Sequence, residues 1–183
     1  AVSAPFLGAM ADQGGFKKRH LLTFSTVGIL ATACLFWIPL GGWPLALAAF
    51  VFASLGFAGG NIFYDALLID VTQKDRIHWV SAVGFSAGYL GGGILFAVNV
   101  AMYLQPTFFG LQNGPQAIKW SFLSVSIWWL LFSLPLFKNV RESRPLRSTM
   151  TQISLWTQGW QQFLKSLRQI QRQKPLWIFL LAY

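Results

Sequence analysis

The sequence predicts an all-α fold, a polytopic bundle of transmembrane helices. Of its 183 residues, 55% are hydrophobic and 10% are charged, whereas a soluble domain typically carries roughly 25% charged residues. Residues 21–64 contain no Asp, Glu, Lys or Arg, and neither do residues 77–118. Because one membrane crossing needs roughly 20 apolar residues, each stretch is long enough for two crossings.

Turn-forming residues divide each of these stretches into two helices. A Pro-Leu-Gly-Gly-Trp-Pro turn interrupts the first stretch, and a segment rich in Gly, Pro and Asn interrupts the second. Four complete crossings are therefore expected, at about residues 21–38, 44–71, 79–104 and 118–137. Apolar segments at both ends of the sequence predict part of a further crossing at each terminus, so we expect a fragment of a longer protein.

The basic residues indicate how the bundle is oriented in the membrane. They gather in alternate connections, and the connections between these contain no Lys or Arg except Lys119. The positive-inside rule places the basic connections in the cytoplasm. This distribution accounts for the net charge of +9 and gives no indication of a nucleic-acid partner. Short loops favour a multi-pass protein of a bacterial cytoplasmic (inner) membrane, with membrane lipid as its surroundings.

Residues 138–175 differ from the apolar segments, since they hold eight Lys and Arg residues and one acid, Glu142. Apolar residues recur at helical spacing between Ile153 and Ile170, which predicts an amphipathic basic helix. Two placements stay open: along the inner membrane surface, or packed on the cytoplasmic ends of the other helices. Residues 176–183 are apolar again and predict the start of a further helix.

The connection before the first complete helix is short, tight and basic. It contains, in order, Gly8, Asp12, Gly15, Lys17, Lys18 and Arg19. This order resembles the pattern Gly-x-x-x-Asp-Arg-x-Gly-Arg-Lys of the loop between the second and third helices of major facilitator superfamily transporters. The resemblance implies a gating role for the loop, in which the Asp12 carboxylate caps a helix end in the other half of the transporter. Its alternative role is to stabilise a turn before Gly14 and Gly15.

The same resemblance implies a domain organisation. Major facilitator transporters consist of two six-helix halves joined by a long cytoplasmic loop. The chain would then be the N-terminal half of such a transporter. Residues 1–137 would form helices two (in part) to six, residues 138–175 the linker, and residues 176–183 the start of helix seven.

Three segments are similar to the vacuole effluxer family, the autophagy-linked amino-acid effluxers of fungi and their bacterial relatives. They are residues 3–12, 61–68 and 84–92. The resemblance implies export or release of amino acids or other small metabolites.

Among the residues of the predicted membrane segments, Asp65 has the highest free-energy cost of insertion into the bilayer. A charge inside a membrane helix must face a cavity or a partner, so it is a functional candidate. Asn61 and Ser54 lie four and eleven residues earlier, on the same helix face. This polar stripe predicts a substrate or proton pathway. The alternative is a structural ion pair between Asp65 or Asp70 and the basic loop, for which Asp70 is the nearer candidate.

The fifth helix carries two further patterns. Gly84, Gly88 and Gly92 are spaced by four, which allows close packing between membrane helices. Asn99 and Tyr103 are also four apart and form a second polar pair toward the outer end. They are candidates to line the transport pathway, or to make a hydrogen bond between helices.

These residues favour a secondary transporter that works by alternating access on a small-molecule solute, with amino acids as candidate substrates and protons as a candidate coupling ion. The alternatives are a membrane scaffold or assembly subunit, and an integral membrane enzyme. The sequence lacks clustered catalytic or metal-binding residues, and its one cysteine, Cys34, cannot form a disulfide framework. It therefore predicts no enzyme, no metal site and no cofactor.

Overall fold

Four long helices make up most of the structure, a computed structural model that describes residues 7–8, 16–73, 75–140, 160 and 164. They are α2 (Lys17–Cys34), α3 (Trp43–Val71), α4 (Ile77–Leu104) and α5 (Gly114–Asn139). Two short 3-10 turns, η1 (Leu35–Trp37) and η2 (Pro106–Phe109), follow α2 and α4. All four long helices are long and apolar enough to cross a membrane, so the predicted all-α membrane bundle is confirmed.

The four predicted crossings are confirmed, and their bounds differ mainly at the starts. Helix α2 begins at Lys17 because the basic residues of the loop form its first turn. Helix α5 begins four residues earlier than expected, at Gly114, because Asn113 caps it: the Asn113 side chain accepts a hydrogen bond of 3.0 Å from the Gln116 amide. The predicted amphipathic helix of the linker lies outside the described residues, except for Trp160 and Leu164, which are exposed.

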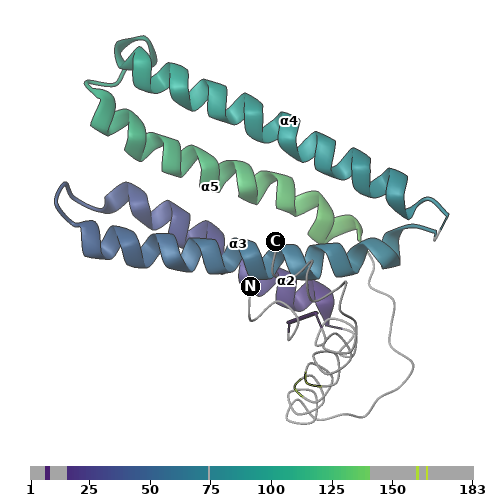
Figure 1. Cartoon of the computed structure of the whole chain (residues 1–183). Coiled ribbons are helices and arrows are strands. Elements are labelled where there is room, and N and C mark those ends of the chain that lie inside the picture. Colours follow the sequence, from purple (N-terminus) through teal and green to yellow (C-terminus); the bar gives the residue numbers. More distant parts are fainter. Residues whose placement is uncertain (1–6, 9–15, 74, 141–159, 161–163, 165–183) are drawn as a thin grey trace, which may run out of the picture.

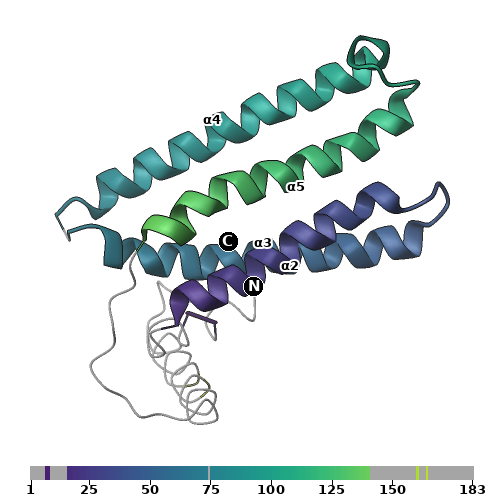
Figure 2. The ribbon, with the colours of Figure 1, turned by 180° about the vertical axis from the view of Figure 1, so that it is seen from behind.

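The helices form two antiparallel hairpins, α2 with α3 and α4 with α5. Helix α5 lies between α4 and the α2–α3 pair, as the opposite views of Figures 1 and 2 both show. The turns after η1 and η2 lie at one end of the bundle, where Gly41 and Gly110 have positive φ angles of 89° and 74°. Lys17, Asp70 and Lys138 are at the other end, which the charge pattern predicts to face the cytoplasm.

The tightest packing in the bundle is between the backbones of α2 and α3. A Cβ atom added to Gly56 would lie 2.6 Å from the Gly28 Cα and 2.7 Å from the Phe24 carbonyl oxygen. Gly59 lies under the Phe24 ring, and Gly28 lies under the Trp129 ring of α5. Glycine is therefore required where α2, α3 and α5 approach one another most closely.

Below this crossing, toward the basic end, the same two helices bury the main apolar cluster. Phe63 is fully buried, with Leu21 and Leu67 beside it. The His20 and Phe24 rings stack on Phe63 at centroid distances of 5.0 and 5.7 Å. The cluster holds one face of α3 against α2. The opposite face of α3 can therefore line cavities between α3 and the other helices.

We expect Gly56→Ala to destabilise the full-length protein by about 1–3 kcal/mol, since the added methyl group would overlap backbone atoms of α2 that cannot move aside. Thermal unfolding of the purified protein in detergent measures this. The matched control is Gly93→Ala, because no atom lies within 4 Å of a Cβ at that position. Both changes bring the same gain in helix propensity. Equal stability of the two variants would contradict the close α2–α3 crossing.

Candidate functional site

Ser54, Asn61 and Asp65 form a polar stripe on the face of α3 that points away from α2. Asp65 follows Gly56 by nine residues, or about two and a half helical turns, which puts it on the opposite side of the helix from the α2 contact. All three side chains are exposed within the described residues. The glycine face of α3 therefore determines where its polar face points.

Three cavities follow this stripe, and we call them together the α3 seam. The outer cavity, about 750 Å³, includes Ser54; the middle one, about 210 Å³, includes Asn61; the inner one, about 280 Å³, includes Asp65. The outer and middle cavities share Phe57, Trp129 and Phe132 in their walls, and the middle and inner cavities share Tyr64 and Leu136. The shared walls make the seam one series of adjoining spaces along α3.

The outer cavity has an aromatic and neutral lining, contributed by all four long helices. Asn99 of α4 lines it and accepts a 2.9 Å hydrogen bond from the Ser124 hydroxyl of α5. Asn99 thus joins two helices and also lies on the cavity; its place in a transport pathway stays a prediction. Gly88 and Gly92 of α4 form part of the same wall, and no atom lies within 4 Å of a Cβ added at either.

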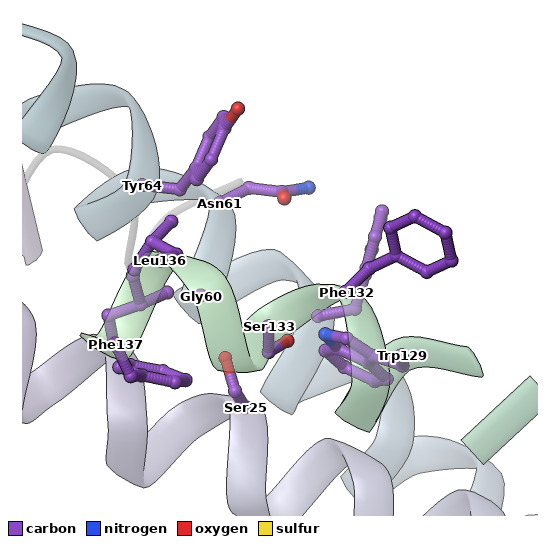
Figure 3. A pocket seen from close by; sticks show the side chains of 11 residues that line it. Ser25, Gly60, Asn61, Tyr64, Trp129, Phe132, Ser133, Leu136 and Phe137 are labelled. Atoms are coloured by element: carbon purple, nitrogen blue, oxygen red, sulfur yellow. The ribbon is translucent and has the colours of Figure 1, made fainter. Parts of the chain in front are cut away.

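The middle cavity is where α2, α3 and α5 meet. Figure 3 shows Asn61 and Tyr64 projecting from α3, Trp129 and Ser133 from α5, and Ser25 from α2. An amide, a phenol and two hydroxyl groups therefore line a small space whose other walls are apolar. These groups can both donate and accept hydrogen bonds, so the middle cavity can bind a polar solute without a charge.

The inner cavity surrounds Asp65 at the end of the seam nearest the basic residues. Its other polar groups are Ser81 of α4 and Tyr64. The Tyr64 hydroxyl oxygen lies 3.5 Å from the position of a Cβ on Gly84, an ordinary van der Waals distance. Asp65 is the only charged residue that lines the three cavities of the seam, and no cation in the described residues pairs with it.

Two adjacent lysines join the start of α2 to the ends of α3 and α5. Lys17 Nζ lies 3.1 Å from Asp70 Oδ2 and donates a second hydrogen bond of 3.1 Å to the Ala66 carbonyl oxygen. Lys18 Nζ donates to the Val140 carbonyl oxygen, at 2.8 Å. The exposed fractions of the Lys17 and Asp70 side chains are 15% and 11%. A cation at a helix C-terminus is also favoured by the helix dipole.

Some of the remaining candidates lie within the described residues and others lie outside them. Gly8 is half-buried and Arg19 is exposed; Asp12 and Gly15 lie outside the described residues. Tyr103 lines none of the three cavities, because its ring packs over Gly114 at the start of α5.

Gly84, Gly88 and Gly92 make no close backbone contact with another described helix. Gly88 and Gly92 instead border the outer cavity. In the part of the chain that the structure describes, glycines at Gly28, Gly56 and Gly59 provide the close helix packing.

Sequence reasoning missed several side chains of the seam. Trp129 separates the outer and middle cavities, and its ring meets Phe57 edge to face at 6.0 Å. Ser25 and Ser133 contribute hydroxyl groups to the middle cavity. A serine or tryptophan in a membrane helix is common, and only the rotation of α2 and α5 about their axes places these three on the seam.

The chain is similar to known membrane transporters. A family model described as "Vacuole effluxer Atg22 like" matches residues 1–79 and 69–183. The uncharacterized MFS-type transporter YxiO of Bacillus subtilis (strain 168) is 33% identical over 184 residues, which cover 100% of this chain and 42% of that protein. An uncharacterized protein of Aquifex aeolicus (strain VF5) is 31% identical over 94 residues, covering 50% of this chain and 23% of that protein. The chain thus spans less than half the length of either relative, and no solved structure matches it significantly.

The Lys17–Asp70 contact predicts energetic coupling between the two side chains. We expect Lys17→Met and Asp70→Asn each to lower the stability of the full-length protein, because each removes one side of an ion pair whose two side chains are mostly buried. The double variant should lose less than the sum of the two single losses, with a coupling energy of about 1 kcal/mol or more. Thermal unfolding in detergent measures all three. The control cycle pairs Asp70→Asn with Lys119→Met, at the far end of the bundle, and should be additive. Additive losses in the Lys17–Asp70 cycle would show that the contact stabilises nothing.

Proposed function

Because this chain belongs to the vacuole effluxer Atg22-like family, within the major facilitator type of membrane transporter, we propose that it moves a small solute along the α3 seam. It is an integral, multi-pass membrane protein of a transporter family. The observation that carries the proposal is the continuity of the seam. Three adjoining cavities follow one polar face of a membrane-spanning helix, from Ser54 through Asn61 to Asp65.

The proposed solute is small, with an apolar body and a few hydrogen-bonding groups, as an amino acid has. Aromatic side chains dominate the outer cavity, where Ser54, Asn99 and Thr32 supply neutral polar groups. An aromatic lining can hold an apolar side chain by burial and an ammonium group by cation–π attraction. The word effluxer in the family description supports export as the direction, and a bacterial cytoplasmic membrane as the location is supported by the Bacillus relative.

The proposed mechanism is alternating access, in which two bundles rock around a site near the middle of the membrane. Residues 1–137 would belong to one bundle, residues 138–175 would link it to the second, and residues 176–183 would begin the second. The Lys17 and Lys18 contacts support a gate at the cytoplasmic end, because they connect the start of α2 to the ends of α3 and α5. In this proposal the loop that contains Gly8, Asp12 and Gly15 completes the gate, with Arg19 on its exposed side.

Asp65 is the proposed site of proton coupling. It lies in the inner cavity, between the proposed gate and the polar groups of the middle cavity. A carboxyl group in that place can take up a proton from one side of the membrane and release it to the other, as the cavities open in turn. Asp70 has the structural role, since its carboxylate is held by Lys17.

Filling the outer cavity should stop transport without unfolding the protein. We expect Gly88→Leu to reduce the uptake of a labelled amino-acid panel into proteoliposomes of the full-length protein by about tenfold or more, the change that ~1.4 kcal/mol produces. The matched control is Gly93→Leu, which lies on the same helix but lines none of the three cavities. A Gly88→Leu variant that is folded and transports as fast as the control would show that the solute takes another route.

Neutralising Asp65 should uncouple transport from the proton gradient. We expect Asp65→Asn to abolish the part of the flux that depends on an imposed pH gradient, because the amide cannot exchange a proton. The matched control is Asp75→Asn, the same chemical change at an exposed loop position, which should leave that part unchanged. Gradient-dependent flux that survives in Asp65→Asn would leave Asp65 as a structural charge. Absence of flux for every amino acid in the wild-type protein would instead refute the amino-acid proposal.

A further inference from the structure

A large apolar groove lies at the end of the bundle opposite the lysine pair. Its volume is about 710 Å³, and its walls come from the turn after η1, the start of α3 and the start of α5. Leu40, Trp43 and Phe50 line it and are 83%, 72% and 60% exposed. Ile118 and Phe122 of α5 form the other side. The groove therefore opens at the end of the bundle that the charge pattern predicts to face outward.

One charged residue, Lys119, lines this groove. It is the only Lys or Arg between Arg76 and Lys138, and none of the five acidic residues of the sequence lies in that interval. Within the described residues it has no hydrogen-bond or ion-pair partner, and its side chain is half-buried. A lysine on this face departs from the positive-inside pattern, and an ammonium group beside an apolar groove is complementary to an anion.

The dipoles of two helices add to the positive potential near Lys119. Both α3 and α5 begin at the groove, since Trp43 and Pro115 of their first turns line it. The positive ends of two helix dipoles therefore point to the same end of the bundle as Lys119. Trp37, which is 67% exposed, and Trp43 are the kind of side chain that lies at the level of lipid headgroups.

We propose that this groove binds an anionic phospholipid of the outer leaflet, with an acyl chain along the apolar walls and the phosphate group on Lys119. Apolar walls open to the membrane suit a hydrocarbon chain, and a cation at the rim selects a headgroup with net negative charge over a zwitterionic one. The groove shares only Leu35, Phe50 and Phe122 with the outer cavity of the seam. The lipid site is thus next to the solute pathway, and it holds or fails independently of the transport proposal.

Photolabelling of the full-length protein tests the site. The protein is placed in phosphatidylcholine nanodiscs that contain a trace of phosphatidylglycerol with a photoactivatable acyl chain. A phosphatidylcholine probe with the same chain serves as the matched control. We expect the anionic probe to label peptides from residues 35–50 and 115–122 about tenfold more than the zwitterionic probe, because the choline cation of phosphatidylcholine offsets the attraction between its phosphate group and Lys119.

Variants at Lys119 then test whether the charge of this residue causes the preference for the anionic probe. Lys119→Glu should bring anionic labelling of these peptides down to the zwitterionic level, Lys119→Arg should preserve it, and Lys138→Glu at the other end of the bundle should leave it unchanged. Lys119→Gln replaces the Glu variant if that one elutes as an aggregate. Labelling of α4 by the zwitterionic probe reports that the fold is intact.

Three results would overturn the proposal. One is equal labelling of the groove by the two probes. Another is an anionic preference that survives Lys119→Glu and Lys119→Gln. The third is a groove that neither lipid labels because another segment of the full-length protein, identified by its crosslinks, occupies it.

Discussion

The close backbone contact between α2 and α3 is the constraint on which the rest of the bundle depends. At Gly56 the backbone of α2 around Gly28 leaves no room for a Cβ atom, so the relative position and rotation of the two helices are fixed at that point. Asp65 and Asn61 lie on the far side of α3 from Gly56. This contact therefore also determines that the polar stripe faces α5 and α4. Trp129 of α5 packs over Gly28, so the position of α5 depends on the same helix crossing. The Trp129 ring also forms the wall between the outer and middle cavities.

The membrane imposes the second constraint, because every charge must lie at a helix end or have a partner or cavity. Lys17 and Lys18 satisfy it by binding a carboxylate and backbone carbonyl groups at the ends of α3 and α5. Asp65 and Lys119 satisfy it differently, since each lines a cavity and has no ionic partner in the described residues. These two residues carry the proposals for proton coupling and for lipid binding.

Much of the fold could be predicted from sequence, because long uncharged stretches and alternating basic connections reflect the bilayer itself. The start of α5 at Gly114 was missed, since it depends on one local hydrogen bond from the Asn113 cap. Close packing stays a prediction at Gly84, Gly88 and Gly92, and among the described helices the close contacts are at Gly28, Gly56 and Gly59. Which glycines meet another backbone depends on where two helices cross, and a spacing of four residues does not contain that information. The pairing of Asn99 with Ser124 likewise follows from the relative rotation of α4 and α5, which is a tertiary property.

In the proposed transport route, water and solute reach α3 along the face that carries Ser54, Asn61 and Asp65. Cysteine accessibility in the reconstituted full-length protein, in a background without native cysteines, tests it most directly. Single cysteines at these three positions should react with a water-soluble, membrane-impermeant thiol reagent, and a transported solute should slow the reaction. A cysteine at Leu55, which is 55% exposed but lines none of the cavities of the seam, should not react. Reaction at Leu55 as fast as at its neighbour Ser54, or none at Ser54, Asn61 and Asp65, would contradict the account.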